Sequence, residues 1–167
     1  MRRYQQADRE AASALIDRLS PRLFHFFLAQ VRERSQAEDL LQDLWLRVHN
    51  SRRTYRFGEP LLPWIYAIAR RVQIDAYRRS SRITKHELQS ERLPEPAADC
   101  STQGASVRMA DLLRDLPATQ RETILLLKVA GLTLSEVARA TGSSVGAVKQ
   151  KAHRAYEALR KSFGGDS

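Results

Sequence analysis

The segment at residues 61–82, LLPWIYAIARRVQIDAYRRSSR, combines two kinds of surface that one helix can carry on opposite faces. On a helix of about 3.6 residues per turn, one face collects apolar side chains, namely Leu61, Ile65, Ile68, Ala69, Val72 and Ala76. A second face carries Arg71, Asp75, Arg78 and Arg82. Because an apolar face must be buried against other elements, the segment predicts a helix that is packed on one side and basic on the other.

Helical periodicity covers most of the chain, and no alternating strand pattern persists. Residues 8–33 predict one or two helices, with Pro21 starting the second, and residues 35–50 predict another. Ser35 and Glu38 have the spacing of a capping box, so we expect a helix to begin there. Further helices are expected at residues 108–115, 118–130, 134–141 and 144–161. The predicted fold class is all-α.

Residues 83–107 lack this periodicity and contain Pro94, Pro96 and Gly104. We interpret them as a flexible, partly disordered linker between a small helical domain at 1–82 and a second at 108–167. A chain of about 25 residues can extend to roughly 80 Å, so such a linker would let the two domains occupy separate sites.

The positive charge of the chain is concentrated in two segments. The 167 residues carry a net charge of +9: residues 47–92 contribute +7 and residues 143–167 contribute +3, while the rest of the chain contributes −1. Clustered basic charge indicates a polyanionic partner. The single cysteine, Cys100, fits a reducing compartment. The start of the chain, MRRYQQADREAAS, lacks an apolar signal core, and the longest apolar run, at residues 61–69, is too short to span a membrane. We therefore expect a cytoplasmic protein.

The stretch LTLSEVARATGSSVGAVKQKAHRAYEALRK predicts a helix-turn-helix. Thr133 and Glu136 form a second capping-box pair. Counted from Leu134, a small residue (Ala138) is fifth, a glycine suited to the turn (Gly142) is ninth, and an apolar residue (Val148) is fifteenth. The second helix has an apolar stripe of Val145, Val148, Ala152, Ala155 and Leu159. Off this stripe lie side chains suited to phosphates and base edges: Lys149, Gln150, Lys151, His153 and Arg154. The alternative is a structural hairpin with a solvated basic face.

Residues 51–60, SRRTYRFGEP, predict a loop in which cations alternate with aromatic rings: Arg52, Arg53, Tyr55, Arg56 and Phe57. Such a mixture suits unpaired bases, which can stack on the rings. The alternative is a plain exposed loop with one aromatic tucked inward. In the helix that follows, Asp75 lies within one turn of Arg71, Arg78 and Arg79, so we expect it to orient their guanidinium groups.

Three runs taken together resemble a known family: AEDLLQDLWLRVH, then PWIYAIARRVQIDAYRRSSR, then LPATQRETILLLKVAGLTLSEVARATGSSVGAVKQKAHRA. In this order and spacing they are similar to group 4, extracytoplasmic-function (ECF) sigma factors of the sigma-70 family, over about residues 8–82 and 108–161. The resemblance implies an RNA polymerase sigma factor. Its first domain would bind the clamp helices of the β′ subunit of core polymerase and open the −10 promoter element, and its second would bind the −35 element.

The resemblance also implies roles for single residues. It implies contact with core polymerase by Asp39, Gln42, Asp43 and Leu46. It implies binding of the −10 region by Arg71, Asp75, Arg78, Arg79 and Arg82, and capture of a flipped non-template base by the loop at 51–60. It implies contacts to the −35 element by Lys128, Ser144, Lys149, Gln150, Lys151, His153 and Arg154. It implies no ATP, metal or other cofactor, and it implies an anti-sigma factor, often membrane-embedded, as a partner.

The sequence departs from the family at two places. Arg71 stands where an asparagine is usual after Ile-Ala-Arg, and Gln150 and Ala152 alter the usual recognition-helix pattern. The promoter sequence therefore does not follow from relatives. An alternative function is a stand-alone helix-turn-helix regulator that binds duplex operators, but it would not need the acidic helix at 35–50 or the basic-aromatic loop. An enzyme is disfavoured because the sequence shows no paired catalytic carboxylates and no glycine-rich phosphate loop, so we expect no small-molecule substrate.

Overall fold

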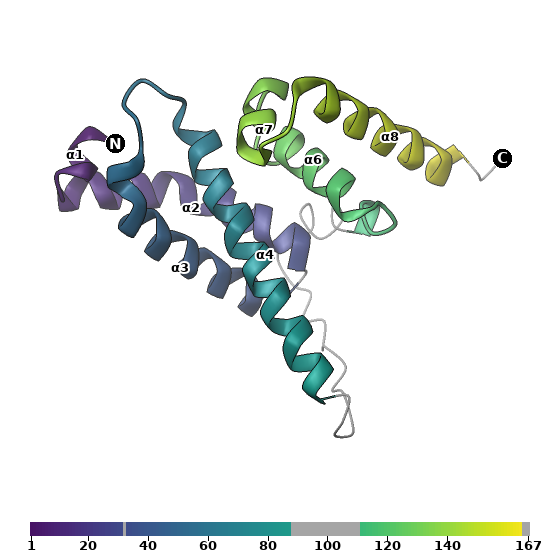
Figure 1. Cartoon of the computed structure of the whole chain (residues 1–167), viewed down its shortest axis with the longest axis horizontal. Coiled ribbons are helices and arrows are strands. Elements are labelled where there is room, and N and C mark those ends of the chain that lie inside the picture. The colour runs from purple at the N-terminus through teal and green to yellow at the C-terminus, as the bar shows by residue number, and fades with distance from the viewer. Residues whose placement is uncertain (32, 88–110, 165–167) are drawn as a thin grey trace.

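The computed structural model describes the backbone of residues 1–31, 33–87 and 111–164, and the side chains of residues 1–31, 33–80 and 111–161. Within these ranges the regular structure is helical and contains no strand, which confirms the predicted all-α class. The elements, shown in Figure 1, are α1 (Arg2–Gln5), α2 (Arg9–Val31), α3 (Arg34–Ser51), the 3-10 turn η1 (Arg52–Thr54), α4 (Leu61–Glu87), α6 (Ala118–Lys128), α7 (Leu134–Thr141) and α8 (Val145–Gly164).

The N-terminal half is built on α2, α3 and α4, with α3 packed against both of the others. The face of α4 that the sequence predicts to be apolar is the one that is buried, with Ile65, Ile68, Ala69 and Val72 in the core. Facing core residues come from α2 and α3 and include Phe26, Phe27, Leu44 and Val48. Trp45 adds a polar contact between helices, because its indole nitrogen donates to Ser20 Oγ at 2.9 Å.

The C-terminal half contains the predicted helix-turn-helix. Thr133 and Glu136 form both hydrogen bonds of the capping box at the start of α7. Gly142 ends α7 with φ of +65°, a left-handed conformation that glycine adopts without steric cost. Ala138 and Val148 are buried, as expected for the fifth and fifteenth positions. Helix α8 packs on α6 and α7, so its buried side fills the core of this half.

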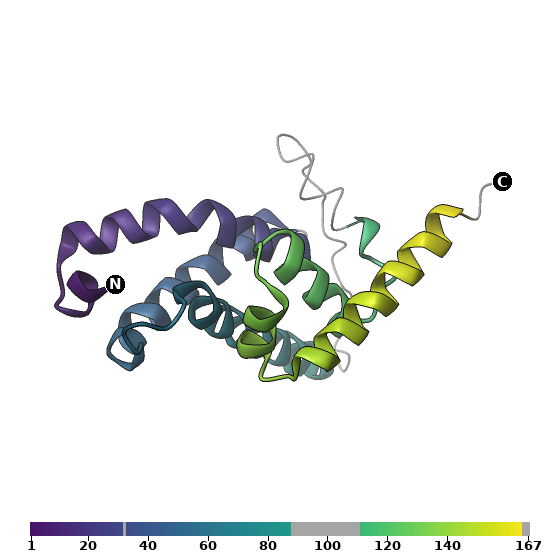
Figure 2. The same cartoon turned by 90° about the horizontal axis from the view of Figure 1, so that it is seen from above.

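The two halves are packed against each other rather than separated. Helix α7 lies directly on α4, and α6 touches α2 (Figures 1 and 2). Arg70 of α4 donates to Glu122 of α6 at 2.8 Å. At the turn before α7, Gly131 has φ of +60°, and a Cβ there would lie 2.5 Å from Nη2 of Arg22 in α2. The absence of a side chain at Gly131 therefore permits this close approach.

Several predicted boundaries are wrong. For residues 8–33 the single-helix alternative holds and a second helix starting at Pro21 does not, because α2 continues through the proline and the turns on both sides of it bury Leu19 and Leu23 in the core. Helix α4 runs to Glu87, so the first residues of the predicted linker are helical, while residues 88–107 lie outside the described part of the chain. In the expected helix at 108–115, the described residues are helical only to Leu112 and then turn.

The capping box predicted at Ser35 and Glu38 is also wrong. Helix α3 begins at Arg34, its N-cap is Glu33, and no side chain caps it. Ser35 Oγ donates to the Glu33 carboxylate at 2.5 Å, and Glu38 pairs with Arg34 at 2.7 Å. A neighbouring acid and a neighbouring arginine therefore engage the two side chains that a capping box requires.

The Thr133 cap gives a direct test of the local structure. Thr133→Ala removes the hydroxyl that accepts from the Glu136 amide, and we expect a loss of about 1 kcal/mol in the free energy of unfolding. Thr133→Ser keeps a hydroxyl at the same place and should retain most of that stability. Urea denaturation of both variants measures the effect, and equal stability of Thr133→Ala and wild type would contradict it.

Glu122 predicts a pH dependence of the packing between the halves. Burial raises the pKa of Glu122, although Arg70 acts in the opposite direction. A group whose folded-state pKa is raised contributes stability that is fully present below its unfolded pKa and is lost as the pH rises through the folded pKa. Glu122→Gln keeps the shape without this charge, so its stability relative to wild type should improve between about pH 4 and pH 7.

Thermal denaturation of wild type and Glu122→Gln over that pH range measures the difference. Taking the difference between the two proteins cancels the contribution of the other carboxylates. A wild-type protein that becomes steadily more stable than the variant as the pH rises would show that the Arg70 ion pair outweighs the burial of Glu122.

Candidate nucleic-acid interface

The outer face of α3 presents three of the four residues predicted to contact a partner protein. Asp39, Gln42 and Leu46 are exposed, and Leu46 retains 60% of its surface although it is a large apolar residue. Asp43 differs, because it is half-buried and its carboxylate lies 3.2 Å from Nη2 of Arg47 and 3.6 Å from Nη2 of Arg79. The structure therefore places Asp43 between α3 and α4 rather than on the open face.

Arg47 is the centre of an ion-pair network that joins α3 to α4. Its Nη1 lies 2.6 Å from Asp75 Oδ2 on α4, and its Nη2 lies 3.2 Å from Asp43 Oδ2 on α3. The hydrogen bond from Arg47 lowers the pKa of Asp75 below its ordinary value. The carboxylate of Asp75 pairs with Arg47 of the facing helix, a partner that the sequence prediction did not include, while Arg78 and Arg79 of its own helix act on it through their charge. The spacing of one turn between Asp43 and Arg47 was the available signal.

The basic side of α4 is open to solvent. Arg71, Arg78 and Arg79 are exposed, and Arg82 lies in the same helix, with a side chain outside the described residues. Arg70 points elsewhere and pairs with Glu122. The predicted two-faced helix thus keeps at least three arginines available for a phosphate backbone.

The loop before α4 separates its two aromatic residues. Tyr55 is buried, its hydroxyl donates to the Glu59 carbonyl, and its ring lies 5.4 Å from that of Trp64. Phe57 is 64% exposed and has the guanidinium of Arg2 at 3.4 Å from its ring centroid. The exposed surface of the loop therefore includes Phe57, Arg53 and Arg56, while Tyr55 packs inward.

Arg52 stabilises the backbone of this loop more than it contributes to its exposed surface. It is half-buried, and its Nη1 donates to the His49 carbonyl at 2.6 Å. Its Nε is buried and has no hydrogen-bond partner within the described part of the chain. The remaining exposed cations of the loop, Arg53 and Arg56, are the ones able to meet a ligand.

Helix α8 presents the predicted recognition surface of the helix-turn-helix. Lys149, Gln150, His153 and Arg154 are exposed on one side of the helix. Ser144 accepts a hydrogen bond from the Ala147 amide at 3.1 Å and so helps to start the helix. Lys151 is half-buried beside Ser143, and Lys128 is exposed near the Tyr156 ring. Val145 is 39% exposed despite its place in the predicted apolar stripe.

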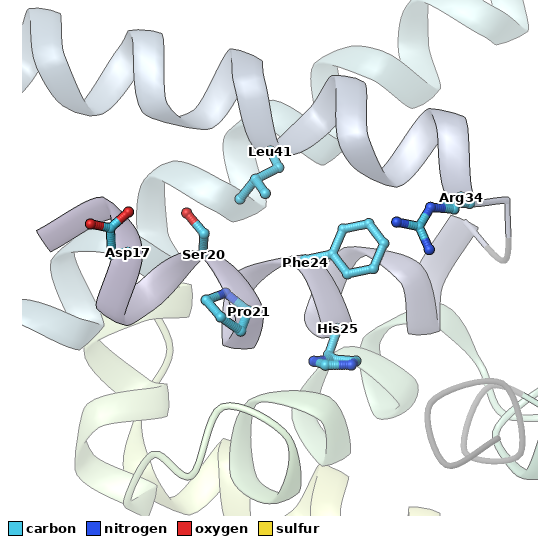
Figure 3. Close-up of a pocket in the computed structure, with 7 residues that line it drawn as sticks. All are labelled: Asp17, Ser20, Pro21, Phe24, His25, Arg34 and Leu41. Carbon is cyan, nitrogen blue, oxygen red and sulfur yellow. The ribbon is translucent and has the colours of Figure 1, made fainter. Parts of the chain in front are cut away.

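A surface hollow between α2 and α3, shown in Figure 3, lies apart from these groups. Three of its polar side chains already have partners: Asp17 accepts from Ser13, Ser20 accepts from Trp45, and Arg34 pairs with Glu38. Among the described residues, no group of three or more histidine, cysteine, aspartate or glutamate side chains could hold a metal ion. No helix in the described ranges is long and apolar enough to cross a membrane.

Comparison with known proteins accounts for both halves of the chain. The profile of Sigma-70 region 2 matches residues 15–83, and that of Sigma-70 region 4 matches residues 106–159. RNA polymerase sigma factor CarQ of Myxococcus xanthus is 32% identical over 98% of this chain and 95% of its own length. The ECF sigma factor SigD of Mycobacterium tuberculosis is 34% identical over 92% of this chain and 77% of its own.

The chain belongs to the ECF sigma factors. This confirms the resemblance seen in the sequence. It also excludes the alternative function of a stand-alone helix-turn-helix regulator, because the N-terminal half matches Sigma-70 region 2. The family comprises transcription initiation factors that direct RNA polymerase to promoters.

Solved structures with the same fold extend over nearly the whole chain. The sigma factor RpoE from Bartonella quintana, in complex with the anti-sigma factor NepR, has a TM-score of 0.75 at 23% identity and covers 93% of this chain and 98% of its own. CnrH, in complex with the cytosolic domain of CnrY, also has a TM-score of 0.75, at 22% identity, and covers 98% of this chain and 94% of its own. At 22–23% sequence identity, the similarity to these two structures establishes the fold alone.

Proposed function

We propose that this sigma factor divides promoter recognition between the two halves described above. The N-terminal half, which ends with α4, would bind core polymerase and the −10 element, and the half from α6 to α8 would bind the −35 element. The observation that carries the proposal is the position of three exposed surfaces: the outer face of α3, the basic side of α4 with its preceding loop, and the exposed side of α8. Promoter recognition and opening would use binding energy alone, without catalysis by the chain. Both would take place in the cytoplasm, where the polymerase acts.

The outer face of α3 is the proposed contact with the clamp helices of the β′ subunit. An exposed leucine between polar and acidic side chains suits a protein partner, because its burial adds apolar area while the acids select a basic surface. We assign Asp39, Gln42 and Leu46 to this contact. Asp43 would support this contact indirectly, because its ion pairs hold Arg47 and Arg79 in place.

The core contact can be tested without disturbing the ion pairs of Asp43. Asp39→Lys combined with Leu46→Ala should weaken binding to core polymerase by tenfold or more, which corresponds to at least about 1.4 kcal/mol. Asp115→Lys reverses a charge at an exposed position in the other half and should bind core normally. The measurement is a titration of labelled sigma factor with core polymerase, and normal affinity of the folded double variant would reject the assigned face.

The basic side of α4 and the loop are the proposed −10 surface. Arg71, Arg78 and Arg79 can contact phosphates, and Arg82 continues the same helix. The exposed ring of Phe57, flanked by Arg53 and Arg56, can stack on a base that has left the duplex. Tyr55 would support the loop by packing against Trp64. Binding energy from the captured strand would then offset the cost of unpairing.

Phe57 is the residue on which strand capture should depend. Phe57→Ala removes an exposed ring, so core binding and the closed complex on duplex promoter should be nearly unchanged. Permanganate-reactive thymines and run-off product should fall about tenfold, because base–aromatic stacking contributes roughly 1–3 kcal/mol per base. A pre-melted promoter should restore only part of the product. Wild-type opening by Phe57→Ala would exclude a capture role for this ring.

The exposed side of α8 is the proposed −35 surface. Lys149 and Arg154 can neutralise phosphates, while Gln150, His153 and Arg154 can reach base edges in the major groove. Ser144 at the start of the helix, Lys151 and Lys128 would lie at the margin of this contact. Gln150 and Ala152 depart from the usual family pattern, so the −35 sequence should differ from that of typical relatives.

Salt dependence distinguishes phosphate contacts in this surface. In the holoenzyme, Lys149→Ala or Arg154→Ala should weaken binding to a duplex promoter and flatten the log–log salt slope by about 0.9 for each lost phosphate contact. Arg160→Ala removes an exposed charge near the far end of α8 and should leave the slope unchanged. Wild-type slopes for both Lys149→Ala and Arg154→Ala would place the DNA elsewhere.

We also propose that the packed arrangement of the halves must open on a promoter. The −10 and −35 elements are about 25 base pairs apart, or roughly 85 Å of B-form DNA at about 3.4 Å per base pair. Helices α4 and α7 are in contact, so one chain in this arrangement cannot hold both elements. An anti-sigma factor, membrane-embedded in many members of the family, is the partner we propose to favour the closed form. Two observations support this partner: the membership of the chain in the ECF sigma factors and the packed arrangement of its two halves.

A further inference from the structure

Helix α1 lies outside the part of the chain that matches Sigma-70 region 2, which begins at residue 15. It nevertheless packs against the loop that contains Phe57, far away in sequence. Tyr4 is buried, and its hydroxyl lies 3.3 Å from Nδ1 of His49 at the end of α3. Arg3 pairs with Asp8 at 2.6 Å, and Ala7 holds the turn into α2 at φ of +63°. A left-handed conformation at a non-glycine residue persists only where surrounding contacts maintain it, so α1 has a defined place.

One side chain of α1 holds both ends of the turn η1. Gln5 Nε2 donates to the carbonyl of Arg52 at 2.9 Å and to the carbonyl of Tyr55 at 2.8 Å. Both acceptors are carbonyl oxygens, so only the amide nitrogen of Gln5 can make this pair of contacts. The two bonds join the first residue of η1 to the residue directly after it, and Phe57 follows two residues later. Gln5 therefore constrains the backbone that presents the exposed ring.

A second side chain of α1 lies on the ring itself. The guanidinium of Arg2 is 3.4 Å from the centroid of Phe57, within the range of a cation–π contact. Phe57 keeps 64% of its surface exposed, so Arg2 leaves much of the ring accessible. Arg2 itself is exposed, and a guanidinium beside a stacked base can also meet the phosphate of the same strand.

We propose that α1 completes the strand-capture site: Gln5 is a positioning residue for the loop, and Arg2 is a contact residue for the unpaired strand beside Phe57. The ligand is the single-stranded non-template DNA of the opened promoter. This inference rests on the proposed capture function of the loop and adds to it residues that the family match does not include. Gln5 acts by holding the backbone, and Arg2 acts by its charge and its planar stacking group.

The positioning role is tested first in the loop itself. Gln5→Glu keeps the size of the side chain but replaces the donor with a charged acceptor, and Gln5→Met removes the donor without adding charge. In both variants, amide hydrogen exchange in residues 52–59 should rise about tenfold, as expected for the loss of two hydrogen bonds, while the melting temperature should fall by only a few degrees. Gln6→Glu makes the same charge change at the exposed neighbour and should exchange like wild type. Wild-type protection in both Gln5 variants overturns the positioning role.

The functional consequence is tested in holoenzyme on the promoter of the chain's own gene. Both Gln5 variants should reduce the rate of open-complex formation on duplex template about tenfold and have less effect on a pre-melted template. Arg2→Gln should also reduce opening, whereas Arg9→Gln, which removes an exposed charge from α2, should not. Wild-type opening rates in the Gln5 variants and in Arg2→Gln overturn the proposal.

A double-variant comparison separates this inference from the capture function on which it rests. If Gln5 acts through the loop, adding Gln5→Met to Phe57→Ala should slow opening little further. Fully additive effects would show that Gln5 acts elsewhere and would overturn the proposal while leaving capture by Phe57 intact. Wild-type opening by Phe57→Ala alone would overturn the capture function, and the inference with it.

Discussion

The burial of helix α4 on two sides is the constraint on which the rest of the structure depends. Its apolar face packs in the core of its own half with α3, and the helix also contacts α7 of the other half. The remaining side of α4 faces solvent and carries exposed arginines. The loop before α4 lies beside α1 and the end of α3. The ion pair Arg47–Asp75 lies where α4 meets α3, and the ion pair Arg70–Glu122 joins α4 to α6 of the other half, so each places a charged pair between α4 and a neighbouring helix.

This arrangement would join the proposed promoter recognition to the proposed regulation. The same helix that carries the proposed −10 surface also holds α7, the first helix of the helix-turn-helix. Opening the two halves would cost the buried contacts of α4 with α7 and the Arg70–Glu122 pair. A partner that binds only the packed form would keep the factor inactive, and binding to polymerase and a promoter would have to exceed that cost.

Local patterns predicted much of the fold, and contacts between distant residues were the part they could not predict. The apolar face of α4 and the Thr133 cap follow from spacing along one helix, so both were predicted correctly. The partner of Asp75 depends on how α3 lies against α4, and Arg47 was missed for that reason. Alternation of cations and rings in the loop could not show that Tyr55 turns inward and Phe57 outward. The contact between Gln5 and the loop joins residues 47 and 50 positions apart, beyond any local motif.

The most direct test of this account is the distance between α4 and α7 in solution. With Cys100 replaced by serine, spin labels at the exposed positions Tyr77 and Arg139 would report the packing of the two halves. The account predicts one short, narrow distance distribution for the free chain, and a distance longer by tens of ångströms in holoenzyme bound to a promoter, as required by elements roughly 85 Å apart. An unchanged short distance in a transcribing complex would contradict it.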